Sequence, residues 1–290
     1  MSNSMEIAIR LGFFGGVLLV MTLWEWLAPR RPLTVRKAPR WVSNLGLVVL
    51  NIVLVRLLVP VTAAAAAIVA QSRGWGVLHL IDWPSWAELV LAMLAFDLTI
   101  YLQHVLFHAV PLLWRLHLVH HADLDFDVTT GVRFHTLEIL LSALIKLAAV
   151  VVIGPSVVAV VIFEVLLNAT AMFNHSNVQM PGWLDGALRW LVVTPDMHRV
   201  HHSVIRRETN SNFGFNFPWW DFLLGTYRRQ PQEGHEAMTI GISHLRDELE
   251  VDRLPRMLAL PFRSHTALDS MESEKDSEHL PAGSAPKEPP

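Results

Sequence analysis

The sequence predicts an all-α integral membrane protein in which about four transmembrane helices carry a histidine-rich helical cap. Hydrophobic residues make up 52% of the chain and charged residues only 17%, whereas soluble domains carry about 25% charged residues. The charged residues are also segregated. They are nearly absent from residues 12–28, 42–70, 86–103 and 137–172. Finally, many of the 15 histidines are concentrated between His104 and His202.

Three of the apolar stretches predict one membrane-spanning segment each, because a bilayer core needs about 20 mostly apolar residues per helix. Residues 8–28 form the first span and residues 85–103 the third. The second, residues 42–70, is long enough to tilt or to break near Pro60. The first span leads into a proline- and arginine-rich stretch without a small-residue cleavage pattern. We therefore expect a retained helix rather than a secretory signal.

The fourth apolar stretch, residues 137–172, is too long for a single span and has Gly154-Pro155 near its middle. Because proline disfavours helical backbone in the residue before it, a hairpin of two helices is predicted over 137–153 and 156–172. Each arm is at or below the length of a full span, so the hairpin is expected to be short or tilted.

Lysine and arginine predict the orientation, because short cytoplasmic loops are enriched in them. The loop 29–41 holds Arg30, Arg31, Arg36, Lys37 and Arg40, whereas the loop 71–84 holds only Arg73. Tracing the spans from there places residues 104–136 and everything after residue 173 on the cytoplasmic side, the C-terminus included. Residues 173–262 should form the cap, and the polar, Pro-rich residues 263–290 should form a disordered tail.

Composition excludes several kinds of site and partner. The net charge of −3 is too small to indicate nucleic acid as a partner. The chain has no cysteine, which excludes disulfides, thiolate zinc sites, Fe–S clusters and cysteine nucleophiles. Any metal ion must therefore be held by histidine, aspartate or glutamate.

Three histidine boxes indicate such a metal site. Positions i, i+3 and i+4 of a helix share a face, so the members of each box are expected to aim at one point. Ordinary surface histidines explain a single box, but not three within 99 residues of an otherwise apolar chain. Eight imidazoles from three helices suit two transition-metal ions. The boxes are His104 and His108; His117, His120 and His121; and His198, His201 and His202.

The donor set also bears on the identity of the metal. Imidazole suits zinc, copper, iron and nickel, and a structural zinc ion uses only four ligands, usually with some thiolate. Two ions with open positions beside an apolar phase suit redox or oxygen chemistry. Iron fits this description best, and zinc stays open as a substitute.

Asp97 lies in the third predicted span, seven residues before His104 and eleven before His108. Both separations return to nearly the same helix face, and a carboxylate inside a membrane marks a functional site by default. We expect Asp97 either to accept the second N–H of a ligand histidine or to pair with another helix.

A second set of polar residues accompanies the hairpin. Glu164, Asn168 and His175 are spaced to line one helix face, and His175 is a ninth ligand candidate. Lys146 is expected to pair with Glu164 across the hairpin. His135, shortly before Glu138, is expected to be either a ligand or a support for one. The remaining histidines, among them His244, are assigned no role.

With the boxes in place, the chain resembles the fatty acid hydroxylase/sterol desaturase superfamily of membrane proteins over residues 97–229. The residues after Trp220-Asp221 resemble the hydroxylase branch more than the acyl-CoA desaturases. The sequence departs from the family at Thr136, where a proline is frequent, which leaves the role of His135 open. The matching stretches are QHVLFH (103–108), RLHLVHH (115–121), DFDVTTGVRFHTLE (125–138), FNHSNV (173–178), TPDMHRVHHS (194–203) and NSNFGFNFPWWDFLLGTYRR (210–229).

This resemblance implies that the eight box histidines are ligands of a di-metal centre, expected to hold two iron ions. It also implies that O2 and electrons from a separate donor are used to hydroxylate or desaturate a lipid C–H bond. It implies three parts: N-terminal transmembrane helices over 1–84, a catalytic domain over 85–262 and the tail over 263–290. The substrate would enter from the bilayer, with aromatic residues along its path. The candidates are Phe107, Trp114, Phe126, Phe134, Phe213, Trp219 and Trp220.

The electron donor is expected to be another protein of ferredoxin, cytochrome or reductase type, because the chain has no cysteine and no Gly-rich dinucleotide loop. Arg206, Arg207, Arg228 and Arg229 offer it a docking surface, although setting the topology is the simpler role for these arginines.

Two other functions compete with this hypothesis. A zinc-dependent membrane hydrolase would need a carboxylate base near the metal and no electron donor. A metal transporter would hold its ligands at mid-membrane on broken helices, whereas the boxes begin where the third span ends. The lipid substrate stays open among fatty acids, sterols, alkylglycerols, carotenoids and sphingolipids.

Overall fold

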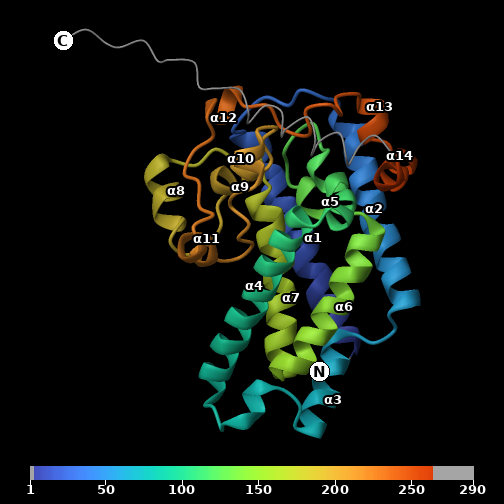
Figure 1. Ribbon diagram of the computed structural model, residues 1–290, viewed down its shortest axis with the longest axis vertical. Coiled ribbons are helices and arrows are strands. Elements are labelled where there is room, and N and C mark those ends of the chain that lie inside the picture. Colours follow the sequence, from blue (N-terminus) through green and yellow to red (C-terminus); the bar gives the residue numbers. More distant parts are fainter. Residues whose placement is uncertain (1–2, 264–290) are drawn as a thin grey trace, which may run out of the picture.

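The long axis of the molecule is set by five long helices that run roughly along it (Figure 1). The computed structural model describes residues 3–263, so nearly all of the predicted tail lies outside the described residues. In this range the regular elements are all helical, which confirms the predicted fold class. The long helices are α1 (Asn3–Leu27), α2 (Lys37–Leu58), α4 (Ser85–Ala109), α6 (Thr136–Ile153) and α7 (Val157–Asn174).

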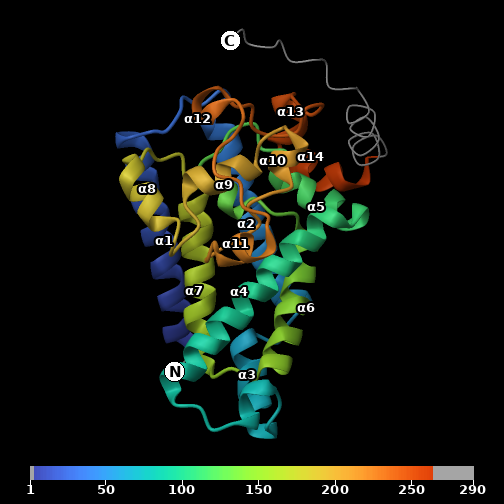
Figure 2. The ribbon, with the colours of Figure 1, turned by 60° about the vertical axis from the view of Figure 1, so that its left-hand side comes forward.

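The second apolar stretch breaks where the sequence predicts. Helix α2 ends at Leu58, and α3 (Ala63–Arg73) begins after Pro60. The Thr62 side chain accepts a hydrogen bond from the backbone N–H of Ala65 at 3.1 Å, which caps the new helix. Helix α3 then packs against α6 and α7 at the end of the molecule away from the cap (Figure 2).

The predicted hairpin is present, with a longer reach than expected. Gly154 ends α6 in the left-handed conformation at φ +68°, and a Cβ there would lie 2.5 Å from the carbonyl oxygen of Trp75. Both arms have 18 residues, so five segments in the described chain are long and apolar enough to cross a membrane. The sequence prediction of about four spans counted three full spans and a short hairpin, and the number of helices that cross the membrane stays a prediction.

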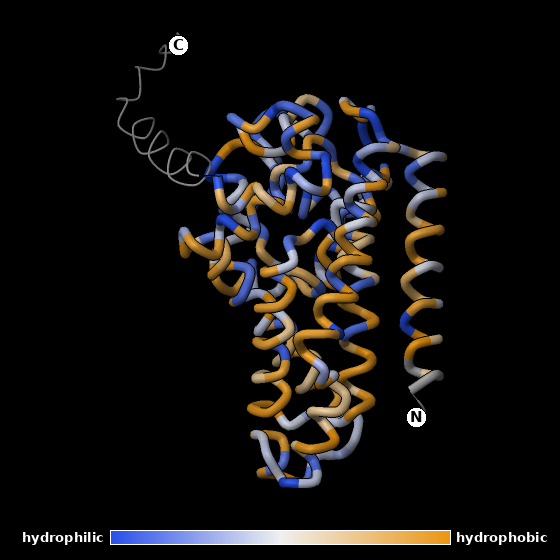
Figure 3. The backbone as a smooth tube through the Cα atoms, turned by 90° about the vertical axis from the view of Figure 1, so that its right-hand side faces the viewer, coloured by the Kyte–Doolittle hydropathy of each residue, from blue (hydrophilic) through white to orange (hydrophobic). Residues whose placement is uncertain are grey.

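The remaining elements gather at one end of the bundle as a cap, where the chain is markedly more hydrophilic (Figure 3). The loop 28–36, residues 110–135 and residues 176–263 all lie there (Figures 1 and 2). The membrane face toward which the cap points stays a prediction, as does the division into domains. The cap elements are α5 (Pro111–His121), η2 (Thr130–Val132), α8 (Gly182–Leu188), α9 (Pro195–His201), α10 (Arg206–Thr209), α11 (Trp219–Leu224), α12 (Gly234–Ala237), α13 (Glu248–Val251), α14 (Leu254–Ala259) and η3 (Leu260–Phe262), while η1 (Val77–Leu80) lies at the other end.

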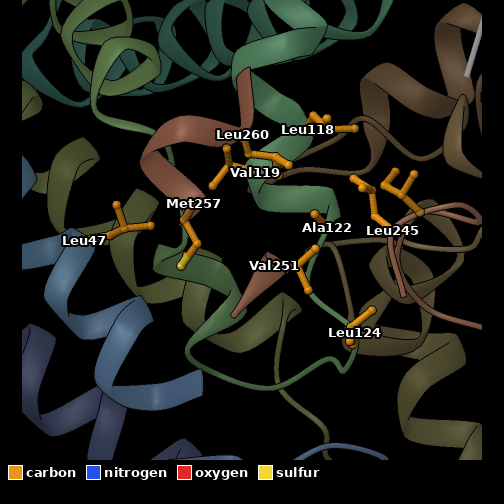
Figure 4. Close-up of a cluster of buried hydrophobic side chains, with 10 residues drawn as sticks. Leu47, Leu118, Val119, Ala122, Leu124, Leu245, Val251, Met257 and Leu260 are labelled. Carbon is orange, nitrogen blue, oxygen red and sulfur yellow. The ribbon is translucent and has the colours of Figure 1, made fainter. Parts of the chain in front are cut away.

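Helix α5 is held from behind by an apolar cluster in the cap (Figure 4). Its Leu118, Val119 and Ala122 pack there with Leu47 of α2 and with Met257 near the end of the described chain. The same helix carries the box histidines His117, His120 and His121, which are buried as well. Apolar packing on one side of α5 therefore fixes the direction in which its histidines point.

Candidate metal centre

All nine histidines that the sequence nominates as ligands fall into two groups at the junction of bundle and cap. In each group, one ring nitrogen from every member lies within 4.8 Å of the others. The donors come from α4, α5 and α9 and from the residues that directly follow α7 and α9. The first group is His104, His108, His117, His121 and His201, and the second is His120, His175, His198 and His202.

The structure differs from the sequence expectation in how each box is used. We expected the three histidines of a box to aim at one point. Instead, His120 of α5 joins the second group, while His117 and His121 join the first. Likewise, His201 joins the first group, apart from its neighbours in sequence. The reason is geometric: adjacent residues on an α-helix point about 100° apart, so each of the two three-histidine boxes serves both groups, whereas His104 and His108 stay together in the first.

The two groups lie side by side, as a pair of metal ions would require. The rings of His121 and His202, one from each group, stack with centroids 4.5 Å apart. Across the same boundary, the ring centroids of His117 and His120 are 5.1 Å apart. The nine rings therefore form one continuous cluster with two foci.

Hydrogen bonds fix the orientation of most of these rings. The Nδ1–H of His117 donates to Glu138 Oε1 at 2.7 Å. Backbone carbonyl oxygens accept from the Nδ1–H groups of four others, at 2.8 to 3.2 Å. A proton held on Nδ1 leaves Nε2 with a lone pair for a metal ion. The four carbonyl bonds join His104 to Phe213, His120 to Arg133, His175 to Ala171 and His201 to Ser211.

The positions of the Nε2 atoms show whether a cation would fit between the rings. The Nε2 atom of His175 lies 3.1 Å from that of His120 and 3.1 Å from that of His198. Since Nδ1 carries the proton in His175 and His120, their facing lone pairs repel each other unless a cation lies between them. In the first group, the Nε2 atoms of His104, His117 and His201 are buried with no hydrogen-bond partner. Such atoms are rare in proteins, so the donor set fits metal ions in both groups.

Burial also sets the protonation state of the cap histidines. Desolvation lowers the pKa of His117 and of His175 to about 3. It lowers the pKa of His120, His198 and His202 well below the usual value, with further lowering from neighbouring histidines. These imidazoles are therefore neutral at neutral pH, which is the form that binds a metal ion.

Asp97 has no hydrogen bond to any of these histidines, and of the two roles expected for it the structure shows the second, pairing with another helix. Its Oδ1 accepts hydrogen bonds from the backbone and side chain of Asn216, at 3.2 and 2.7 Å. Its Oδ2 accepts from Phe217 N at 3.3 Å and from Trp220 Nε1 at 2.9 Å. The spacing to His104 gave the correct helix face but ignored the rise along it, which is roughly 10 Å over seven residues.

The other polar candidates on the hairpin also lie apart from the two groups. Glu164 forms ion pairs with Lys146, as expected, and with Arg10 at 2.5 Å. Asn168 donates to the backbone carbonyl of Glu164 at 2.7 Å. His135 is in neither group, and its Nδ1 accepts from Leu137 N at 3.2 Å, which caps α6. Of the supporting residues proposed from the sequence, Glu138 is the one bonded to a ligand candidate.

A loop near Phe213, whose role in orienting the ligands the sequence did not predict, supplies much of the support. It provides the carbonyl oxygens of Ser211 and Phe213 to His201 and His104. The carboxylate of Asp221 holds this loop by accepting from Phe213 N and Gly214 N, each at 2.8 Å. Backbone acceptors leave no residue-specific signal, and only the turn-forming composition of residues 210–216 hinted at such a loop.

Access to the cluster is narrow. A cavity of about 70 Å³ lies beside His108 and is lined by Trp114, Ser203 and Asn210, among others. His108 is also the one ligand candidate among the nine that is not classed as buried. Five of the predicted path aromatics, Phe107, Trp114, Phe126, Phe134 and Phe213, contact box histidines or His175. Trp219 and Trp220 instead bond to the carbonyl oxygen of Trp190 and to Asp97.

The bond from His117 to Glu138 predicts a measurable effect on metal binding. In Glu138→Ala, His117 loses the acceptor that fixes its tautomer, so the affinity of the first group for metal should fall roughly 10–100-fold. Competition with a calibrated chelator would measure the affinity. Glu138→Gln keeps an acceptor oxygen and should recover part of the loss. Equal affinity in Glu138→Ala and the unaltered chain would contradict this role.

Comparisons with known proteins agree with this geometry. Residues 89–226 match the fatty acid hydroxylase family. The ornithine lipid hydroxylase OlsE of Rhizobium tropici is 29% identical over 182 residues, or 63% of this chain and 52% of that protein. The alkylglycerol monooxygenase of Xenopus tropicalis is 30% identical over 59% of this chain and 36% of its own length. The cholesterol 25-hydroxylase of Rattus norvegicus is 26% identical over 50% of this chain and 48% of its own.

The chain thus spans about half or less of the length of these relatives. No solved structure matches it significantly. The matched residues include all nine clustered histidines: seven within α4, α5 and α9, together with His175 and His202, which directly follow α7 and α9. The family match over residues 89–226, the long apolar helices and the clustered histidines agree with one another and support a place for this chain in the fatty acid hydroxylase superfamily.

Proposed function

We propose that this protein is an O2-dependent oxidoreductase that hydroxylates a lipid C–H bond at a di-iron centre held by the nine clustered histidines. One observation carries the proposal: two adjoining groups of neutral imidazoles turn metal-binding nitrogens inward at the end of a membrane bundle. The printed names of the relatives, which are lipid hydroxylases and a monooxygenase, support the reaction class. Residues 85–262 would form the catalytic domain.

The reaction balances as RH + O2 + 2 e⁻ + 2 H⁺ → ROH + H2O. A bound iron pair would supply the reduction of O2, and the chain's own residues would position it and keep the surroundings dry. Phe134 stacks on the His120 ring at 4.4 Å, and Phe213 borders His104 at 5.5 Å. These rings limit the entry of water and leave an apolar wall beside the donors, which suits a hydrocarbon substrate.

The electrons would come from a separate protein of ferredoxin, cytochrome or reductase type, because a chain without cysteine carries no Fe–S centre. The cytoplasmic placement of the cap belongs to this proposal and is supported by the five basic residues of the loop 29–41. A cytoplasmic reductant would then have access to the same side as the cluster.

The donor set speaks against the zinc hydrolase alternative. Among the residues that the structure describes, neither histidine group contains a carboxylate. Glu138 is near, but it accepts the His117 Nδ1–H and is occupied as an orienting group. A hydrolase of this type would need a carboxylate free to act as general base.

A single-turnover experiment tests the proposal. The protein, purified into lipid nanodiscs and loaded anaerobically with ferrous iron, would be reduced and then exposed to O2 labelled with a heavy isotope. Ornithine lipids, alkylglycerols and sterols would form the first substrate panel. Hydroxylation places one labelled oxygen in the lipid, whereas desaturation removes two hydrogens and leaves no label. The same protein loaded with redox-inactive zinc serves as control.

The expected result is labelled, hydroxylated lipid from the iron-loaded protein and none from the zinc-loaded control. Lipid cleavage by the zinc form, without O2 consumption by the iron form, would replace this proposal with the hydrolase.

A further inference from the structure

Helices α8 and α11 expose an unusually apolar surface on the cap. The side chains of Trp183, Trp190 and Leu223 are 76%, 68% and 73% exposed. Leu191 and Leu224 extend the same surface, and Trp219 Nε1 joins its two halves by donating to the carbonyl oxygen of Trp190 at 2.7 Å. We call Trp183, Trp190, Leu191, Leu223 and Leu224 the α8–α11 patch. An apolar surface of this kind marks a site of contact with lipid or with another protein.

The charged residues within 181–191 and 219–225, which are Asp185, Arg189 and Asp221, all have partners inside the protein. Asp185 pairs with Arg189 at 2.7 Å and also accepts from Thr194 at 2.6 Å. Asp221 is fully buried beneath the loop that it holds. The exposed residues of 181–191 and 219–225 are only glycine, alanine, proline, leucine and tryptophan. Such a surface exposes no charge to be stripped of water if lipid covers it.

Asp97 sets the depth at which the patch lies. It belongs to the membrane-spanning α4 and is eleven residues before His108, or roughly 16 Å lower along the helix axis. All its hydrogen bonds go to the chain just before or within α11, at Asn216, Phe217 and Trp220. Helix α11 therefore lies beside the middle of a spanning helix, and Figure 2 shows it between α4 and α7.

The backbone N–H and C=O groups of the irregular chain before α11 have hydrogen-bond partners in the protein, as a membrane environment requires. Non-helical backbone is tolerated at membrane depth only where its N–H and C=O groups find partners in the protein. Asp97 accepts from the backbone N–H groups of Asn216 and Phe217. Asn174 of α7 donates to Phe215 O at 2.9 Å, and Val193 N donates to Asn216 O at 3.0 Å. The backbone of this stretch thus finds its hydrogen-bond partners elsewhere in the protein, at a depth where water cannot supply them.

We propose that the α8–α11 patch is inserted into the bilayer as a sixth, re-entrant membrane contact, with acyl chains covering Leu223 and Leu224. Lipid is favoured over a partner protein because α11 is hydrogen-bonded to the spanning helix α4 through Trp220 and Asp97, and α4 exposes apolar side chains such as Leu102 and Leu106. The tryptophans at its upper edge match the preference of this side chain for the membrane interface.

Site-directed spin labelling in nanodiscs tests the proposal, and the absence of cysteine from the chain removes any background. Leu223→Cys and Leu191→Cys would each carry one nitroxide. Leu57→Cys on the exposed lipid face of α2 and Glu236→Cys on the top of the cap, where the glutamate side chain is 77% exposed, are the matched controls. All four sites are exposed, so the substitutions should leave the fold intact.

We expect the label at Leu223 to collide freely with O2 and rarely with a water-soluble nickel complex, as at Leu57. The label at Leu191 should lie between this behaviour and that at Glu236. Collision rates at Leu223 equal to those at Glu236 would overturn the proposal. So would spin–spin broadening at Leu223 that disappears on dilution with unlabelled protein, because a second copy would then cover the patch. Neither readout depends on metal or activity, so the result stands apart from the proposed hydroxylation.

Discussion

His121→Ala is expected to abolish turnover and to release metal from the first histidine group. Both ring nitrogens of His121 are buried without a hydrogen-bond partner, and its ring stacks on that of His202 across the boundary between the groups. Removal of a group that hydrogen-bonds to a metal ligand lowers metal affinity or activity roughly 10–100-fold. Removal of the ligand imidazole itself should therefore lower turnover more than roughly 100-fold. The measurements are metal content per chain and the labelled-oxygen assay.

The matched control for this prediction is His244→Ala. His244 is exposed and belongs to neither group, so its replacement should leave both metal content and turnover unchanged. Full metal content in His121→Ala would show that the first group does not bind metal in the way that we propose. Equal losses in the two variants would point to a general effect of histidine removal on expression or folding.

The contrast between His121 and Asp97 shows which parts of the site follow from sequence. The histidine boxes were visible because ligand spacing on a helix is a local property, set by 3.6 residues per turn. The acceptors that fix the rings are not local. Phe213 O, for example, lies 109 residues from its partner His104. Such contacts depend on how the cap folds over the bundle, and a backbone carbonyl leaves no mark in the residue pattern.

The fold was predictable to a similar degree. Long charge-free stretches and Pro60 gave the spans and the break between α2 and α3, because membrane helices impose strong limits on composition. The split of the two three-histidine boxes between the groups, and the contact of Asp97 with the loop at Asn216, depend on the rotation of each helix and on the depth of its residues together. Helical periodicity supplies rotation alone, which explains why it could not decide between the two roles expected for Asp97.

Arg40→Ala should be the most destabilising replacement outside the histidine cluster. The guanidinium of Arg40 is fully buried, donates to both carboxylate oxygens of Asp123 at 3.1 and 3.2 Å and also contacts Asp127. Removal of one partner leaves two buried carboxylates uncompensated, which costs roughly 3–5 kcal/mol. The change in the free energy of unfolding would be measured by unfolding the protein in mixed micelles that contain increasing amounts of denaturant. Arg36→Ala is the matched control: Arg36 is 72% exposed and 3.9 Å from Glu248, so its loss should cost less than about 1 kcal/mol.

The same network ties protein stability to the metal site, which sharpens the test. Asp123 follows His121 by two residues, and Asp127 continues the loop, accepting also from Trp41 Nε1 at 2.9 Å. Burial alone would raise the pKa of Asp127, but the Arg40 guanidinium and the hydrogen bonds from Trp41 and Thr129 together more than offset it, so the pKa lies below its ordinary value. The penalty in Arg40→Ala should therefore come from buried charge rather than lost packing. Adding Asp123→Asn and Asp127→Asn to that variant should then recover much of the stability. If the triple variant is no more stable than Arg40→Ala, the guanidinium acts by filling space, and the electrostatic account is wrong.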